Sequence, residues 1–437
     1  MKIERAVYLY IILVSLLSLA IFPVISHLLS DDVFYHLIVV REMINSKTPL
    51  IIHEPWFNAP EGVFHNRPPL FYWLMVLVSI GGVLNIEHVA IFFQFIFYPL
   101  ALLTVYCLAS YIDNKRVGLI SVIILSTYLP FFARTHLCIP EALEHVMVPL
   151  ALLYYLKGKE KTCGLFLLAL FLNHSYYPFL VLFIIVSHWT LYKRRSYNLL
   201  STLLIALPGI SLQLYYRLHS IMGYVIMVTS MTTTGYVDCH NVSYAILCTA
   251  IILFVGLLSM WKSTHNQKNN ILVMWFLSTI PILFLYHPAR FPAYVASPLI
   301  IAIAMLIDDE INRYTGSWTY SRTIQGIAIL LFINIIISTA FFTYAYDLAT
   351  PALDDMEASA LSWISENIPE NQIILVPSGY GKCMSYRIVY YTNHGVTTIP
   401  SNSTCFYVAS QELSNDDWVI YRRWGWYRIY KRDNCSV

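Results

Sequence analysis

The chain has 437 residues, of which 58% are hydrophobic and only 12% are charged, and its mean hydropathy is +0.61. A soluble domain of this size does not need so much apolar surface, so the composition excludes a soluble globular protein and indicates a multi-pass membrane protein. The formal net charge of +2 gives no electrostatic case for a nucleic-acid partner.

The first hydrophobic segment, residues 6–29, follows a basic flank of Lys2 and Arg5. It has nearly the length of a full span and lacks a small-residue cleavage site, so we predict a retained anchor. Asp31 and Asp32 come directly after it. One explanation for such a pair is a solvated helix N-cap, a position that aspartate favours. The other is a site for a metal, an ion or a substrate, because carboxylates at the ends of membrane spans are costly and are usually kept for a function.

Charge in the short loops decides which apolar segments cross the membrane, because basic residues there stay on the cytoplasmic side. If residues 69–85 lie in the outer interface instead of crossing, the following basic clusters all fall inside, at 115–116, 157–161 and 193–195. Pro68-Pro69 also suits the start of a short interfacial helix.

This assignment predicts a polytopic α-helical membrane protein with about eleven spans. The predicted spans are 6–29, 86–112, 117–133, 144–157, 162–174, 177–192, 197–216, 241–261, 271–287, 291–308 and 323–344. We expect two domains: residues 1–344, a transmembrane domain with the outer loop 30–85, and residues 345–437, a small extracytoplasmic α/β domain.

Within the tail, hydrophobic periodicity predicts a helix from Asp354 to Asn367. It also predicts five strands, at 372–376, 396–399, 406–409, 418–422 and 427–431. Residues 385–392 fit a helix or a strand.

Glu141 and Glu144 stand three residues apart at the start of a predicted helix, directly after Pro140, so they share a face. Acids are favourable at a helix N-terminus, which is the structural interpretation. The functional interpretation is ligation of a hard divalent cation, Mg²⁺ or Mn²⁺, which prefers oxygen ligands. Because Asp32 is predicted on the same side of the membrane, we expect the three acids to share one site.

Three further side chains on that side are candidates for substrate binding. Arg290, between two apolar spans, either reaches the lipid headgroups or clamps a phosphate with its guanidinium fork. Arg67 suits an interfacial anchor, with phosphate binding as the alternative. His174 interrupts a hydrophobic hairpin, either as a structural histidine or as a hydrogen-bond donor to substrate.

Several of these segments resemble, in order, the catalytic subunits of archaeal oligosaccharyltransferases, which belong to the GT-C superfamily of membrane glycosyltransferases. The matching stretches are Asp32-Val33-Phe34-Tyr35-His36-Leu37, Pro60-Glu61-Gly62, Arg67-Pro68-Pro69-Leu70, Arg134 through Glu141, Ala289-Arg290-Phe291-Pro292-Ala293-Tyr294 and Glu357 through Gly381. The chain departs from the family where a Trp-Trp-Asp-Tyr-Gly block binds the acceptor, because Pro377-Ser378-Gly379-Tyr380-Gly381 stands there and keeps only Tyr380 of the side chains.

The resemblance implies a GT-C-like catalytic domain over residues 1–344 that moves a sugar or oligosaccharide from a polyprenyl or dolichyl (di)phosphate carrier. It implies that Asp32, Glu141 and Glu144 are catalytic residues and ligands of Mg²⁺ or Mn²⁺, and that Arg290 contacts the lipid diphosphate. The acceptor would be a protein, a lipid or a glycan, and Tyr380 would be one of the substrate-binding residues. The active site and the tail would face outward from a prokaryotic cell membrane.

Two alternatives stay open. A transferase of the same superfamily could use a lipid monophosphate sugar, which the missing acceptor block favours. From another class, the chain could be a transporter or a non-catalytic scaffold in glycan assembly, although it lacks the inverted repeats that are common in transporters.

Overall fold

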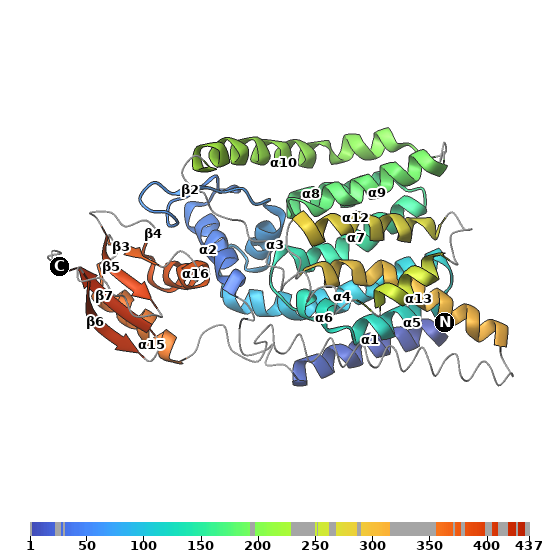
Figure 1. Cartoon of the computed structure of the whole chain (residues 1–437), viewed down its shortest axis with the longest axis horizontal. Helices are drawn as coiled ribbons and strands as arrows, with labels where there is room; N and C mark the ends of the chain where they lie inside the picture. Colours follow the sequence, from blue (N-terminus) through green and yellow to red (C-terminus); the bar gives the residue numbers. More distant parts are fainter. Residues whose placement is uncertain are drawn as a thin grey trace. The chain divides into compact units, whose positions relative to one another are not determined.

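A computed structural model describes residues 2–21, 28, 31–192, 197–228, 250, 252–261, 268–285, 290–314, 355–369, 372–376, 381–397, 404–409, 418–424 and 427–432 (Figure 1). The chain divides into two compact units. The first contains Met1–Ile25, Phe92–Tyr216 and Val225–Leu348, and the second contains Ser26–Ile91, Arg217–Tyr224 and Ala349–Val437.

Helices build the first unit. They are α1 (Lys2–Ile21), α4 (Ile86–Ile112), α5 (Lys115–Ser126), α6 (Leu129–Thr135), α7 (Pro140–Leu156), α8 (Glu160–Asn173), α9 (Tyr177–Tyr192), α10 (Leu199–Val228), a helix over Ile252–Trp261, α12 (Asn270–Leu285) and α13 (Phe291–Tyr314). Ten of the predicted spans fall on these helices in whole or in part, which confirms their helical character. The predicted span 323–344 lies outside the described residues.

Within the described residues, three helices are long and apolar enough to cross a membrane: Ile86–Ile112, Leu199–Leu218 and Phe291–Arg313. The pair α5 and α6, which is bent by 82° at its break, would add a fourth if it forms one span. The total of about eleven crossings stays a prediction, because the described residues provide three or four helices that meet both the length and the composition of a span.

Two helices form the interior of this unit. Nearly every residue of α7 is buried, and so is most of the apolar stretch of α13. The short helix α6 packs against both of them, while α8 and α9 pack against α7, and α5 and α12 pack against α13. Polar side chains in these buried stretches are therefore withdrawn from lipid and water alike, and each needs a partner inside the bundle.

The second unit combines helices with two sheets. The outer loop supplies α2 (Asp31–Ser46), β1 (His53–Glu54), β2 (Val63–Phe64) and α3 (Leu70–Val78). The tail supplies α15 (Asp355–Asn367), β3 (Ile373–Leu375), α16 (Gly381–Thr392), β4 (Val396–Thr397), β5 (Thr404–Ala409), β6 (Trp418–Trp424) and β7 (Tyr427–Arg432). The helix and the strands that periodicity predicts in the tail are present, and the segment that fitted either class is the helix α16.

The five tail strands form one sheet in the order β4-β3-β5-β7-β6. Strand β3 runs parallel to β4 and β5, and β7 runs antiparallel to β5 and β6. Helix α15 packs against β6 and β7, and α16 packs against β4 (Figure 1). The result is a small α/β arrangement.

Backbone hydrogen bonds join the outer loop to this sheet. The amide of Val396 in β4 donates to the carbonyl of Trp56 at 2.9 Å, and the amide of Ala59 donates back to the carbonyl of Val396 at 3.0 Å. The guanidinium of Arg41 in α2 donates to the carbonyls of Tyr390 and Val389 at 2.6 and 3.1 Å. Loop and tail therefore share one compact unit, and a separate domain over 345–437 stays a prediction.

The predicted orientation can be tested at the loop before α8. In a background without the native cysteines, Lys159→Cys should resist an impermeant thiol reagent in intact cells and react after permeabilisation, because its exposed side chain is predicted to be cytoplasmic. Glu61→Cys, on the exposed outer loop, is the matched control and should react in intact cells. The opposite labelling pattern would reverse the topology.

Candidate active site

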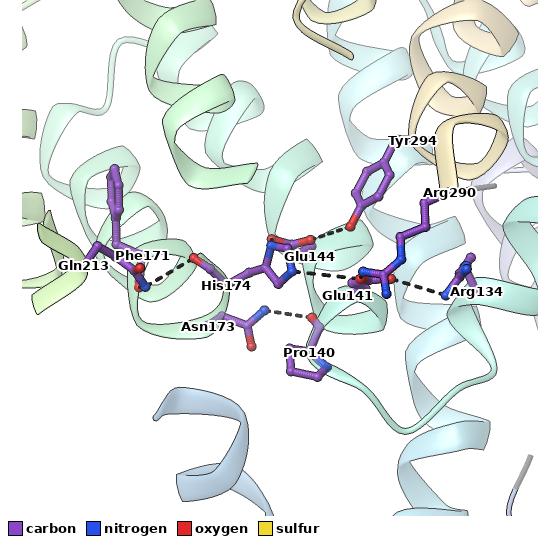
Figure 2. Close-up of polar contacts among 10 residues, drawn as sticks. All are labelled: Arg134, Pro140, Glu141, Glu144, Phe171, Asn173, His174, Gln213, Arg290 and Tyr294. Carbon is purple, nitrogen blue, oxygen red and sulfur yellow. Dashed lines mark hydrogen bonds and ion pairs between the residues drawn. The ribbon is translucent and has the colours of Figure 1, made fainter. Parts of the chain in front are cut away.

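The first turn of α7 carries the two glutamates of the candidate site. Pro140 is its first residue, so the preset backbone angle of proline starts the helix directly after Ile139, whose backbone is extended. Glu141 and Glu144 then point into the bundle, with relative exposures of 4% and 0% (Figure 2). Burial this complete is uncommon for carboxylates, and it requires compensation by nearby donors.

Glu141 lies between two guanidinium groups. Arg290 Nη1 donates to Glu141 Oε1, and Arg134 Nη1 donates to Glu141 Oε2 at 3.4 Å. Arg134 comes from the last turn of α6, and Arg290 directly precedes α13. Both arginine side chains are largely buried, with exposures of 9% and 16%. The result is a row of alternating charges across three helix ends.

Glu144 is held by an uncharged donor and an imidazole. The hydroxyl of Tyr294, in the first turns of α13, donates to Glu144 Oε2 at 2.9 Å. His174 Nδ1 lies 3.1 Å from Glu144 Oε1, and His174 Nε2 lies 3.9 Å from Glu141 Oε1. The imidazole therefore lies beside both carboxylates at ion-pair distance, although it makes no hydrogen bond to Glu144 Oε1.

The position of His174 is fixed by its neighbours. It caps the C-terminus of α8 with an extended backbone. The side-chain Nε2 of Gln213 in α10 donates to the carbonyl of Phe171 at 2.5 Å and to that of His174 at 3.3 Å. The side chain of Asn173 donates to the carbonyl of Pro140 at 2.7 Å, which ties the end of α8 to the start of α7 (Figure 2).

The structure thus brings together four residues that sequence analysis selects, namely Glu141, Glu144, His174 and Arg290 (Figure 2). It adds Arg134 and Tyr294, to which the sequence analysis assigns no role. Both lie within motif stretches quoted above, and Tyr294 follows Arg290 by four residues, one helical turn later.

Asp32 and Arg67 belong to the second unit. Asp32 is exposed in the first turn of α2, and the Arg67 guanidinium lies over the Tyr35 ring at 4.6 Å. The Tyr35 hydroxyl donates to Glu54 Oε1 at 2.5 Å, and this oxygen also contacts His65 Nδ1 at 2.5 Å. Burial, aided by the Glu54 charge, raises the pKa of Tyr35 well above 10, so the phenol stays protonated. Tyr380 lies outside the described residues.

The predicted metal ligands offer the oxygen donors that Mg²⁺ and Mn²⁺ prefer. However, within the part of the chain that the structure describes, no three His, Cys, Asp or Glu side chains are grouped to hold a metal ion. Both oxygens of Glu141 contact guanidinium groups, which a metal would have to displace. The described side chains therefore do not fit a metal as they stand, and we derive no chemical step through one.

No protein-family model and no curated protein matches this sequence. Solved structures of the same fold do exist. The archaeal oligosaccharyltransferase AglB from Archaeoglobus fulgidus, in complex with an inhibitory peptide and a dolichol-phosphate, superposes with a TM-score of 0.70 at 13% identity, over 93% of this chain and 69% of that chain. ArnT from Cupriavidus metallidurans, bound to undecaprenyl phosphate, superposes with a TM-score of 0.57 at 11% identity, over 98% and 97%.

The chain shares the fold of the archaeal oligosaccharyltransferase and of ArnT. This confirms the resemblance predicted from the ordered motifs. At identities this low, the comparison shows a common fold and nothing about shared substrates. A further structure of the Archaeoglobus fulgidus enzyme, with a TM-score of 0.66 at 12% identity over 91% of this chain and 67% of that chain, is a complex with Zn and sulfate.

The contact between Tyr294 and Glu144 can be measured by a double-mutant cycle. Tyr294→Phe removes the donor to a buried carboxylate and should lower the free energy of unfolding by about 1–3 kcal/mol. Combined with Glu144→Leu, which removes the acceptor at similar volume, the two losses should be non-additive. Thermal unfolding in detergent measures the stability loss of each single variant and of the double variant. Tyr98→Phe, whose buried hydroxyl donates to the carbonyl of Ser126 instead, is the control and should be nearly additive. Additivity for Tyr294 as well would contradict the assigned contact.

Proposed function

We propose that the protein is a glycosyltransferase that moves a sugar or oligosaccharide from a polyprenyl or dolichyl (di)phosphate carrier to an acceptor on the outer face of the membrane. The observation that carries this proposal is the buried cluster at the α6–α7 turn, in which guanidinium groups meet acids. It occurs in a fold whose solved relatives include complexes with dolichol-phosphate and undecaprenyl phosphate.

The proposed reaction exchanges one bond for another at the anomeric carbon of the donor sugar. An acceptor nucleophile forms a bond to that carbon while the bond from the carbon to the carrier phosphate breaks. Asp32 orients the nucleophile and accepts its proton. Arg290 stabilises the negative charge that grows on the leaving phosphate, and donors fixed in a low-dielectric site contribute several kcal/mol to such steps, on the order of 3–4 kcal/mol for one donor.

The two carrier classes are each favoured by one observation. The stretch around Arg290, which resembles the segment whose arginine meets the lipid diphosphate in archaeal oligosaccharyltransferases, favours a diphosphate-type donor. The matching length of ArnT, of which 97% is covered, favours a lipid monophosphate sugar as donor and a protein, lipid or glycan as acceptor. We propose that Arg67, His174 and Tyr380 contribute to substrate binding in either case. The fold favours a transferase over a transporter or a scaffold.

A gene-deletion strain tests the function directly. Cells without the gene should accumulate a lipid-linked sugar and lose one glycan class, both detected by mass spectrometry. Wild type should restore the glycan and Asp32→Ala should not, because the acceptor then has no carboxylate to orient it. Asp309→Ala, an exposed acid at the far end of α13, is the matched control and should restore it. Equal rescue by Asp32→Ala would show that this acid is not catalytic and would favour a scaffold or a transporter instead.

Metal dependence forms a separate prediction. If Asp32, Glu141 and Glu144 together hold Mg²⁺ or Mn²⁺, as we propose from the family resemblance, EDTA should stop transfer by the purified protein and Mn²⁺ should restore it. Bound manganese, measured by mass spectrometry of the metal, should fall in Asp32→Asn and stay at the wild-type level in Asp309→Asn. Full transfer in EDTA would remove the metal from the proposal.

A further inference from the structure

Glu54, in the short strand β1 of the outer loop, is a buried acid that has no role in the reaction proposed above. Its exposure is 4%, so its carboxylate is withdrawn from water. One oxygen, Oε1, makes two contacts of 2.5 Å, with the Tyr35 hydroxyl and with His65 Nδ1. Because an ionised carboxylate can only accept hydrogen bonds, the tyrosine and the histidine are both donors here. Hydrogen bonds to a charged group are among the strongest in proteins, so this contact fixes all three side chains.

Two more ring side chains continue this network toward α3. His36 Nδ1 lies 3.1 Å from the Tyr72 hydroxyl, and the ring centroids of His65 and Tyr72 are 5.7 Å apart. The four ring side chains have exposures between 1% and 6%. A buried polar network of this kind makes the surrounding structure rigid. The Glu54 network, made of Tyr35, His36, Glu54, His65 and Tyr72, therefore fastens α2 to β1, to the residue after β2 and to α3.

Asp32 lies on the side of α2 that this network holds. Tyr35 and His36 follow it by three and four residues, and side chains at these spacings are neighbours on one face of a helix. Asp32 itself is exposed and lies in the first turn, and helix ends fray. A rigid attachment one turn later therefore determines the direction in which the first turn presents the Asp32 carboxylate.

Packing around the Tyr35 ring keeps its hydroxyl directed at Glu54. The Phe57 ring stacks on it with the centroids 5.9 Å apart, and the Tyr386 ring lies 5.3 Å away. The Arg67 guanidinium lies over the same ring. These contacts involve the ring and not the hydroxyl, so loss of the hydroxyl alone would remove the hydrogen bond and leave the packing in place.

We propose that Glu54 is a positioning residue for the transfer, which holds α2 through Tyr35 so that Asp32 faces the acceptor nucleophile. The inference rests on the proposed function, in which Asp32 orients the nucleophile and accepts its proton. Glu54 itself touches neither the sugar nor the phosphate. Its role requires an oxygen that accepts the hydrogen bonds of Tyr35 and His65, and it does not require transfer of a proton to Glu54.

Transfer by the full-length protein in nanodiscs tests this role, with the lipid extract and the cell envelope of the deletion strain as the sources of donor and acceptor. Tyr35→Phe and Glu54→Leu should each lower kcat on the order of 10–100-fold, because a shift of about 1 Å at a reacting centre costs up to about two orders of magnitude. Tyr35→Phe keeps the ring under Arg67, so the KM for the donor should stay near that of wild type. Glu54→Gln keeps Oε1 as an acceptor and should retain most of the activity.

Two comparisons separate positioning from a general loss of structure. When Tyr35→Phe is added to Asp32→Ala, it should reduce the residual transfer no further, because the group that it positions is already absent. Glu357→Leu is the matched control, since this acid of the same unit is 3% exposed and is held by Arg387. It should lower the melting temperature about as much as Glu54→Leu and leave kcat near the wild-type value.

The inference would be overturned by a wild-type kcat in Tyr35→Phe, by an equal loss of kcat in Glu357→Leu, or by a loss in Glu54→Gln as large as that in Glu54→Leu. The same holds if Tyr35→Phe lowers the residual transfer of Asp32→Ala by its full factor. If Glu54→Leu does not fold, Tyr35→Phe and Glu54→Gln decide it. If wild type transfers no sugar from the extract, the proposed function fails whatever the variants do.

Discussion

A carboxylate inside a bundle of apolar helices must be neutralised where it stands, and Glu141 and Glu144 impose this constraint twice within one turn of α7. Each ion costs several kcal/mol to bury without partners. The compensating groups come from separate segments of the chain, namely Arg134 of α6, His174 at the end of α8, and Arg290 and Tyr294 at the start of α13. The two acids thus determine which helix ends must meet.

This constraint also explains what the sequence could predict about the site. Glu141 and Glu144 are conspicuous because acids are rare in such an apolar chain, and Arg290 and His174 are conspicuous because they interrupt apolar runs. Residues of this kind stand out without any knowledge of the fold. Tyr294 does not, since aromatic residues are abundant throughout the chain, and only the packing of α13 on the bundle brings its hydroxyl to Glu144.

Apolar runs in the sequence predict the helices well. An α-helix makes its backbone hydrogen bonds within itself, so one continuous stretch of sequence is enough to indicate it. The limits appear where local pattern and three-dimensional packing differ. The sequence predicts one span over 117–133, yet this stretch breaks into α5 and α6, which meet at 82°. The bend places Arg134, in the last turn of α6, near the start of α7. In the tail, residues 385–392 were undecided because their pattern suits both classes, and packing of α16 against α2 and α15 settles them as a helix.

The hydrogen bonds between the outer loop and β4 have a consequence for handling this protein. The edge of the tail sheet at Val396 is completed by the backbone around Trp56, and Arg41 covers the carbonyls that end α16. A fragment cut near residue 345 would expose that edge and leave those carbonyls to water, and an exposed strand edge invites aggregation. A soluble version for binding studies should therefore carry the loop and the tail in one polypeptide, joined by a linker in place of the helical bundle.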